Sequence, residues 1–512
     1  MPVAELEVLP APPLPSVSDE QPVVATGWSI IALRPIIRAA AVRGMVPSLL
    51  RSRAPQCGQS ISSVFAWQPQ EGQATKLVGS ISTGSTATLQ GVKWPRCASC
   101  ILPGMIPRTT APVRALRPDD YVTARPIYAV WELTMKCDQP CAHCGSRAGH
   151  AREVELSTAE ILEVARSLVR LGCREVALIG GEAYLRTDLH EIVGELAAGG
   201  IRVAMQTGGR ALTRERAMAL KAAGLSGLGV SVDGTARVHD RLRGNLGSHQ
   251  AALRALDAGR EAGLGLAANT QINRLNCDSL RETCAELREH GVQTWQVQLT
   301  VPMGRAADHP EWILEPWRVV EVVDTLADIQ NQATRDYVSG IPFNVFANNN
   351  IGYFGPHEQV LRSRPGGPET HWKGCRAGIN LVGIESDGTV KACPSLPTAP
   401  YAGGNVRELS LEQIWESSEQ VRFSRDRTAD ELWGHCKTCY YADTCRAGCS
   451  WTAHCTLGRR GNNPFCYHRV VQLRRKGIRE RLEPRERPPN VPYDYGRFEL
   501  VEEPWPAADE PG

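Results

Sequence analysis

The chain has 512 residues, and 57 lysines and arginines against 55 aspartates and glutamates give a formal net charge of +2. This balance gives no reason to expect a nucleic-acid or membrane-surface protein, and no apolar run reaches the roughly 18 residues of a membrane-spanning helix. The length allows about two to four domains. The 17 cysteines are an odd number, which fits a disulfide framework poorly. Their spacing therefore decides between packed thiols and metal ligands.

The N-terminal part differs in composition from the rest of the chain. Between Gln21 and Pro107 the only acidic residue is Glu71, and Ser, Gly and Thr are frequent. We therefore expect residues 1–115 to be a low-complexity, disordered extension. Three other interpretations stay open: a transit peptide, a start assigned upstream of a true start at Met105, and a small domain that binds a leader peptide.

From Tyr128 onward, short apolar runs alternate with amphipathic segments, as in repeated βα units. Strands are expected at residues 128–133, 175–179, 202–206, 228–232, 264–271 and 294–300. Helices are expected at residues 158–171, 188–198, 213–223, 248–262 and 279–290, the first with a capping box of Ser157 and Glu160. Such units predict parallel strands with right-handed crossovers. The fold class is therefore α/β, a partial (β/α)6 TIM-like barrel over residues 120–335, with its active face at the C-terminal strand ends.

The regular pattern ends after an expected helix at residues 316–332. Residues 336–374 are expected to bridge to the next domain, mostly as loop, because residues 343–367 are rich in Asn, Gly and Pro. A β-hairpin is expected at residues 381–384 and 390–392, around an Asp-Gly turn.

A small Cys-rich domain is expected over residues 375–470, because cysteines are dense between Cys436 and Cys466. A basic helix at residues 469–481 and a Pro-rich tail are expected to close the chain over residues 471–512.

The strongest motif follows the first expected strand: Cys137, Cys141 and Cys144 at C-x3-C-x2-C spacing. Three thiolates from one short loop can wrap an iron–sulfur cube and leave its fourth iron without a protein ligand. Soft thiolates suit iron–sulfur clusters or zinc, but tetrahedral structural zinc needs a fourth ligand. The position, at the C-terminal end of a barrel strand, is where catalytic groups belong.

This triad, preceded by Trp131-Glu132-Leu133-Thr134, resembles the signature of radical S-adenosylmethionine (SAM) enzymes. The resemblance covers about residues 125–470. It implies that SAM chelates the open iron, that an electron from the cluster cleaves SAM to a 5′-deoxyadenosyl radical, and that this radical abstracts a substrate hydrogen atom.

The resemblance also implies residues that contact SAM. Gly180-Gly181-Glu182 is similar to the family's GGE motif, which holds the SAM ammonium, although Ala183 stands where proline is common. Two glycines allow close backbone approach, and the carboxylate accepts from a cation. Further contacts are implied at or near later strand ends, by Ser231, Asp233, Arg243 and Asn269.

A second cysteine pattern resembles the SPASM extension of these enzymes. It consists of Cys375-x12-Gly388-x4-Cys393, then Cys436-x2-Cys439-x5-Cys445-x3-Cys449, and finally Cys466. The resemblance implies a first auxiliary [4Fe–4S] cluster on Cys375, Cys393 and Cys449. It implies a second on Cys436, Cys439, Cys445 and Cys466, so three clusters in all.

Two questions on these cysteines stay open. The first auxiliary cluster lacks an assigned fourth ligand; Cys455, His371 and an open iron that binds substrate are the alternatives. A zinc ribbon could also use the cysteines between Cys436 and Cys449, but it would not account for the barrel triad.

The resemblance implies a peptide-maturase-like enzyme that modifies a ribosomally made peptide by a thioether, a carbon–carbon crosslink or another oxidative change. Formylglycine formation is disfavoured, because Pro394 stands where sulfatase-maturing members carry an aspartate base. No catalytic base is assigned from the sequence. Alternatives are the same chemistry on a small molecule, such as a tetrapyrrole or aminocyclitol, and a non-enzymatic iron–sulfur or zinc-binding protein.

The implied partners are a precursor peptide and a flavodoxin- or ferredoxin-type electron donor, without nucleic acid or membrane. Oxygen-labile clusters and free thiols need a reducing compartment, so a cytoplasmic location is expected.

Overall fold

The structure is a computed structural model that describes residue 114 and residues 116–348 and 350–506. The expectation for residues 1–115 falls almost wholly outside the described residues. The described chain is built on one nine-stranded sheet with the order β7-β6-β5-β4-β3-β2-β1-β8-β9. Its strands are β1 Tyr128–Glu132, β2 Glu175–Ile179, β3 Arg202–Thr207, β4 Leu225–Ser231, β5 Gly265–Ile272, β6 Thr294–Leu299, β7 Asn344–Ala347, β8 Leu381–Ile384 and β9 Val390–Lys391.

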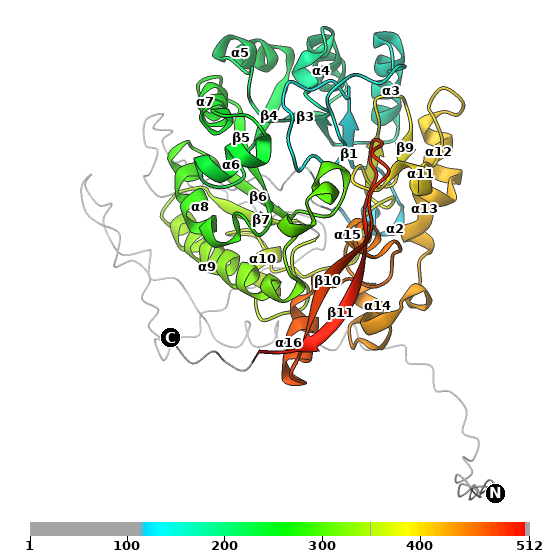
Figure 1. The fold of residues 1–512 in the computed structure, drawn as a ribbon. Coiled ribbons are helices and arrows are strands. Elements are labelled where there is room, and N and C mark those ends of the chain that lie inside the picture. The colour runs from blue at the N-terminus through cyan, green and yellow to red at the C-terminus, as the bar shows by residue number, and fades with distance from the viewer. Residues whose placement is uncertain (1–113, 115, 349, 507–512) are drawn as a thin grey trace, which may run out of the picture. The chain divides into compact units, whose positions relative to one another are not determined.

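The first six strands confirm the predicted α/β barrel, since each pairs in parallel with the next. Helices form an arc outside these strands (Figure 1). Those of the barrel are α3 Thr158–Arg170, α4 Leu189–Ala198, α5 Arg214–Ala223, α6 Ala236–Arg243, α7 Ser248–Glu261, α8 Leu280–Glu289 and α9 Val319–Val338. The predicted capping box of Ser157 and Glu160 starts α3.

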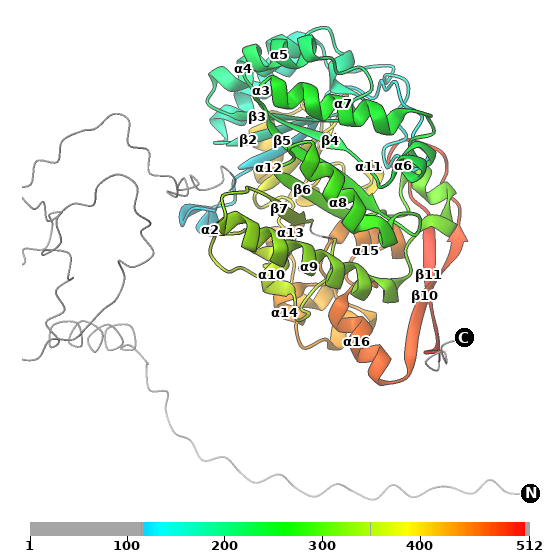
Figure 2. The ribbon, with the colours of Figure 1, turned by 90° about the vertical axis from the view of Figure 1, so that its left-hand side faces the viewer.

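Alternation along the strands separates two faces of the sheet. Val203, Leu228, Leu266 and Trp295 are buried and belong to the main apolar core. Residues between them, such as Gln206, are half-exposed. The helices lie against one side of the strands (Figure 2), so the half-exposed residues line the inner face of the barrel.

The bridging region is more regular than its composition predicts. Residues 344–347 form β7, which pairs in parallel with β6, and α10 follows at Glu358–Arg362. Phe343 and Val345 are 2% and 1% exposed. Four residues are too few to show a period, so the neighbouring Asn, Gly and Pro dominated the prediction of loop.

The predicted hairpin is formed by β8 and β9, and β8 pairs in parallel with β1. The Cys-rich domain therefore extends the barrel sheet instead of standing apart from it. Its helices are α11 Thr398–Tyr401, α12 Leu411–Ser417, α13 Glu419–Asp426, α14 Ala442–Cys445, α15 Ser450–Leu457 and α16 Tyr467–Arg475; the short helix α2 (Asp119–Val122) precedes β1.

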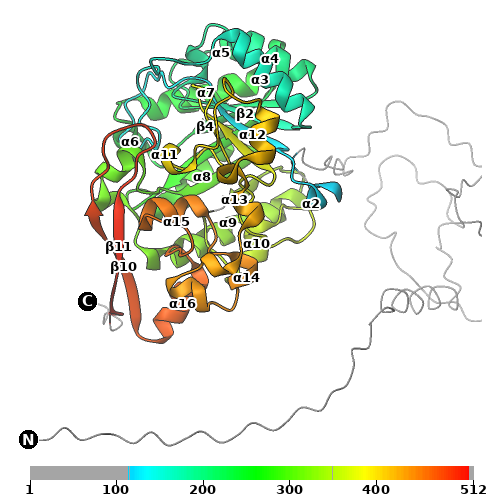
Figure 3. The ribbon, with the colours of Figure 1, turned by 90° about the vertical axis from the view of Figure 1, so that its right-hand side faces the viewer.

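The predicted C-terminal segment is corrected by the structure. The basic helix expected at residues 469–481 ends at Arg475, followed by Gly477 at a φ of 70°. The expected tail instead forms an antiparallel ribbon of β10 (Ile478–Glu486) and β11 (Arg497–Pro504), which lies beside α15 (Figure 3). Cross-strand ion pairs such as Arg479–Glu503 stabilise it, and these charges hide the usual strand pattern. Among the described helices, none is long and apolar enough to span a membrane.

Candidate functional site

The three cysteines of the barrel lie on one closed loop, residues 136–149, which we call the cysteine loop. It leaves the C-terminal end of β1 and returns to it, since Cys137 N donates to Gly149 O at 2.9 Å. Lys136 and Gly149 form an isolated parallel bridge at the neck. Cys141 is buried, whereas Cys137 and Cys144 are half-buried, and all three are free thiols.

The donor set of this loop fits a multi-iron group. Burial, together with negative charge on Glu182, Cys141 and Cys144, raises the pKa of the Cys137 thiol to about 12. Such thiols bind as thiolates only opposite strong positive charge, which a metal supplies. Zn–S bonds of about 2.3 Å would bring the sulfurs of a zinc site to about 3.8 Å from one another. Within the described chain, the one group of three possible ligands that all lie within 4.8 Å of one another is Cys137, Asp138 and Glu182, so no three cysteines approach as closely as zinc requires.

The two glycines of the GGE motif pack against the neck of the cysteine loop. Gly181 N donates to Thr134 O at 2.7 Å, and Glu182 N donates to Lys136 O at 2.8 Å. A Cβ atom on Gly180 or Gly181 would clash with these same backbone segments. The two glycines were expected to let the backbone approach a cofactor closely. In the structure they also let it approach the backbone of residues 134–136.

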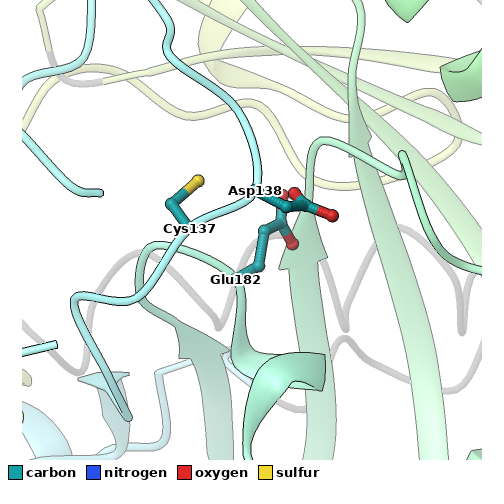
Figure 4. Close-up of side chains that lie close together, drawn as sticks. All are labelled: Cys137, Asp138 and Glu182. Carbon is teal, nitrogen blue, oxygen red and sulfur yellow. The ribbon is translucent and has the colours of Figure 1, made fainter. Parts of the chain in front are cut away.

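The carboxylates of Asp138 and Glu182 lie side by side next to Cys137 (Figure 4). Glu182 is buried and accepts from Thr207 Oγ1 and Gly208 N, both at 2.6 Å. Its burial raises the pKa of Glu182 to about 7. Asp138 accepts from a tyrosine hydroxyl through Oδ2, but its buried Oδ1 has no hydrogen-bond partner among the described residues. Two adjacent carboxylates with an unused acceptor suit a cationic group such as an ammonium. Sequence reasoning missed Asp138, because only the fold brings it to Glu182.

Asp233 and Arg243 form a buried ion pair behind the cysteine loop, with Oδ2 and NH2 2.5 Å apart. Asp233 also accepts from Gln271 N at 2.9 Å and lies 3.2 Å from His143 Nε2. Arg243 and His143 hold the pKa of Asp233 well below its usual range despite burial. Arg243 NH1 lies 3.6 Å from Cys141 Sγ, so it links the aspartate to a cysteine. The two ring nitrogens of His143 face Asp233 Oδ2 and Leu242 O, at 3.2 and 2.9 Å.

The later strand ends present a row of primary amides on the inner face of the barrel, which we call the amide face. Asn269 donates to Gln206, and Asn348 Nδ2 donates to Gln298 Oε1 at 2.9 Å. Gly229 leaves room for the Gln206 side chain, because a Cβ there would clash with it. The amide face consists of Gln206, Asn269, Gln271, Gln296, Gln298 and Asn348.

The predicted Ser231 stands beside Asn269 in the β4–β5 register, at the edge of the amide face. The sequence pointed to Asn269 but missed Gln206 and Asn348. The period of two along β3 could have revealed Gln206. Asn348 follows a strand that was not predicted.

The seven later cysteines separate into two sets. Cys436, Cys439, Cys445 and Cys466 line a single cavity, together with aromatic side chains including Tyr441. The other set consists of Cys375, Cys393 and Cys449, whose charges interact: desolvation, and then negative charge on Cys375 and Cys449, raises the pKa of the half-buried Cys393 thiol to about 12. The sequence pattern implied the same two ligand sets; that these cysteines hold two clusters stays a prediction.

The structure distinguishes the candidates for the missing fourth ligand of the set formed by Cys375, Cys393 and Cys449. Cys455 is fully buried, and charge on Cys449 and Cys393 raises the pKa of its thiol. His371 is exposed, and its Nδ1 lies 2.9 Å from Trp372 O. Cys455 is therefore the better placed spare donor.

A parallel α/β barrel with a cysteine loop at the end of its first strand, followed by a domain with two further cysteine sets, defines a class of enzymes that carry iron–sulfur groups. Residues 131–287 match the family model of the radical SAM superfamily, and residues 375–440 match the SPASM iron–sulfur cluster-binding domain. The chain belongs to the radical SAM superfamily and carries its SPASM extension. It is therefore an enzyme whose family uses SAM and iron–sulfur clusters.

Known relatives are similar over most of their length. An AdoMet-dependent heme synthase of Methanosarcina barkeri is 30% identical over 68% of this chain and 98% of its own. The mycofactocin maturase MftC of Mycolicibacterium smegmatis is 30% identical over 67% of this chain and 82% of its own. The structure of Streptococcus suis SuiB bound to S-adenosylmethionine has a TM-score of 0.50 at 16% identity, covering 64% of this chain and 74% of that one, and supports the fold.

Proposed function

We propose that this radical SAM enzyme abstracts a hydrogen atom from a ribosomally made peptide and installs a thioether, a carbon–carbon crosslink or another oxidative modification. The observation that carries the proposal is the uncharged amide face of the barrel. The similarity to the maturase MftC supports it. An external flavodoxin- or ferredoxin-type protein supplies electrons, in a reducing, cytoplasmic location.

The proposed ligands follow from the cysteine geometry. Cys137, Cys141 and Cys144 hold the SAM-binding cluster, and the seven later cysteines hold two auxiliary clusters in the two sets described. When bound, the cluster and SAM together supply the one-electron chemistry that generates the hydrogen-abstracting radical. The cavity lined by four cysteines fits a fully ligated group.

The chain's own residues position SAM in this proposal. Asp138 and Glu182 accept the ammonium, because their adjacent carboxylates favour a cation. Gly180 and Gly181 keep Glu182 against the neck of the cysteine loop. The edge formed by Ser231 and Asn269 offers hydroxyl and amide groups for the ribose.

Asp233 and Arg243 act behind the cofactor in this proposal. The ion pair fixes Arg243 beside Cys141, and its buried Nε has no hydrogen-bond partner in the described part of the chain. The Nε–H of the guanidinium thus stays available to donate to a carboxylate of SAM, while the ion pair with Asp233 fixes the orientation of the group.

The amide face favours a peptide over a carboxylate-rich small molecule. A primary amide offers both donors and an acceptor, so it can pair with both polar groups of a peptide bond. A tetrapyrrole would present carboxylates, which call for lysine or arginine. The half-exposed positions of β5 and β6 on this face carry no charged side chain: Gly265, Ala267, Asn269, Gln271, Thr294, Gln296 and Gln298. The lining there therefore matches neutral, hydrogen-bonding groups.

A second candidate, oxidation of a tetrapyrrole, is favoured by one observation, the similarity to an AdoMet-dependent heme synthase over nearly its whole length. The two candidates differ in the substrate and share the cluster chemistry. The amide-face variant Gln298→Leu separates them, since it removes hydrogen bonding at nearly unchanged volume. Peptide modification should fall, whereas turnover of a tetrapyrrole should change little, because its carboxylates call for lysine or arginine and not for this amide.

The test is co-expression with short peptides encoded beside the gene, followed by mass spectrometry. We expect a loss of two hydrogens from one peptide with the wild-type enzyme and no change with Cys141→Ala. No mass change on any peptide, together with anaerobic turnover of an iron tetrapyrrole, would replace the peptide by the second candidate.

A further inference from the structure

The loop that joins β10 and β11, residues 487–496, reaches back to the mouth of the barrel; we call it the C-terminal tip. Its Tyr493 and Asp494 are 6% and 5% exposed, although they lie in a connection between two strands that each have only one buried residue. Gly496 N donates to Pro302 O at 3.2 Å, and Tyr495 forms an antiparallel bridge with Met303. The tip is therefore docked on the loop that follows β6.

Asp494 binds the cysteine loop directly. Its Oδ1 accepts from Arg147 Nε at 2.7 Å, across 347 residues of sequence. Arg147 stands three positions after Cys144 and has a φ of 55°, a left-handed conformation that arginine adopts only when its surroundings hold it there. Asp308 accepts from both terminal nitrogens of the same guanidinium, at 2.7 and 2.8 Å. Two acids from distant segments thus fix the returning arm of the cysteine loop.

The tip also binds the loop after β6, which in turn packs against the backbone of the cysteine loop. Gly304 N donates to Asp494 O at 2.7 Å, and a Cβ on Gly304 would clash with Cys144 O. Arg305 N donates to Cys144 O at 2.9 Å, and its Nε donates to Cys141 O at 2.6 Å. Arg305 therefore binds the backbone carbonyls of Cys141 and Cys144, and the neighbouring Gly304 is bound in turn by Asp494.

Tyr493 anchors the same tip to the rest of the fold. Its hydroxyl donates to Glu132 at the end of β1, and Lys391 Nζ of β9 lies 3.9 Å from its ring centroid. Its ring packs with Met135 and Cys455, and Cys137 and Cys144 lie against the same apolar cluster. The tip thus joins the barrel, the cysteine loop and the Cys-rich domain at one point.

We propose that the C-terminal tip is a strap that holds the cysteine loop in its metal-binding conformation, and that Asp494 is its positioning residue. This inference rests on the proposed function, in which the loop carries the SAM-binding cluster. The strap lowers the number of conformations open to the loop, so that three thiols converge before a cluster is bound. Cluster retention and SAM affinity then depend on the far end of the chain.

The test compares Asp494→Ala with Glu499→Ala in the full chain. Glu499 is the matched control, because it lies on the same ribbon and pairs with exposed Arg485 at 2.6 Å. In cluster-free protein, alkylation of Cys137 and Cys144 should accelerate about tenfold in Asp494→Ala and stay unchanged in the control. Cys277 and Cys284, which are buried in the barrel, should stay protected in both and report an intact fold.

In reconstituted protein, Asp494→Ala should lose the SAM-induced change in the electron paramagnetic resonance of the barrel cluster, or show it only at about tenfold higher SAM. Asp494→Glu should restore part of both effects. Should Asp494→Ala expose all cysteines at once, Asp494→Asn, which keeps the side-chain shape, decides instead. Wild-type alkylation rates and SAM response in a folded Asp494 variant would overturn the strap while leaving the proposed function intact. Failure of the wild-type triad to take up iron would overturn the proposed function itself.

Discussion

At the scale of single residues, the site depends on glycines as much as on cysteines. Gly181 packs so closely on the neck of the cysteine loop that any side chain there meets the backbone of residues 135–136. Backbone cannot move aside as a flexible side chain can. The GGE motif therefore fixes the position of the neck of the cysteine loop, in addition to any contact with a cofactor.

Gly181→Ala is expected to lower the free energy of unfolding by about 1–3 kcal/mol, as overpacking does, and to reduce iron bound at the barrel triad. Gly145→Ala is the control, because it lies in the same loop with nothing within 4 Å of its added Cβ. Denaturant midpoints and iron content of both variants check this. Equal effects of the two changes would contradict the account.

His239 makes stability depend on pH. It is fully buried, and its Nδ1 accepts from Asp233 N at 3.0 Å. Burial and nearby Arg243 lower the pKa of His239 to about 3. The unfolded chain takes up this proton below about pH 6.5 while the folded chain does not, so acid favours unfolding between about pH 6.5 and 3.

From pH 7 to pH 5 this group alone should lower the free energy of unfolding by about 2 kcal/mol. His239→Asn keeps an acceptor for Asp233 N but cannot titrate. Between pH 7 and pH 5 its free energy of unfolding should therefore fall by about 2 kcal/mol less than that of wild type. Denaturation of cluster-free protein at the two pH values measures this. The same acid sensitivity in both proteins would show that other groups dominate.

At the scale of elements, the Cys-rich domain is part of the barrel sheet. Because β8 pairs with β1, removal of the hairpin would leave β1 as an unpaired edge next to the cysteine loop. The barrel and the Cys-rich domain should therefore depend on each other for folding.

A chain that ends at Gly374 should aggregate, whereas one that ends at Gly477 keeps β8, β9 and all later cysteines and should keep the association state of the full chain. The second chain lacks the ribbon and its tip, so it separates the role of the hairpin from that of the strap. Light scattering after size exclusion gives the answer. A well-folded monomer ending at Gly374 would disprove the interdependence.

Periodic elements were predictable, and short or charged ones were not. The helices and strands from β1 to β6 follow from apolar spacing, because each repeats its period several times. β7 has four residues, and arginine and glutamate occupy six of the nine positions of β10, where strands normally show apolar residues. Within the site, the cysteines and Glu182 were predictable from motifs. Asp138 and Asp494 were not, since only the folded chain brings them to their partners, whereas the period of two along β3 could have revealed Gln206.

At the scale of the whole molecule, the three cysteine sets predict that replacing a cysteine of one set removes the iron of that set alone. Reconstituted wild type should hold about twelve irons, and Cys137→Ala and Cys436→Ala should each lose about four. These two residues belong to the loop and to the four-cysteine cavity. Iron and sulfide analysis measures the losses; a variant that loses nothing would remove its cysteine from the ligand sets.

If the cysteine loop is the site of SAM cleavage, the cleavage must depend on its cysteines. This is measured as the anaerobic, reduced formation of 5′-deoxyadenosine from SAM by wild type, Cys141→Ala and the control Cys284→Ala, which alters a buried thiol of α8. Wild type and the control should cleave SAM, and Cys141→Ala should not, even while its auxiliary clusters are retained. Cleavage by Cys141→Ala at the wild-type rate would show that SAM is cleaved elsewhere.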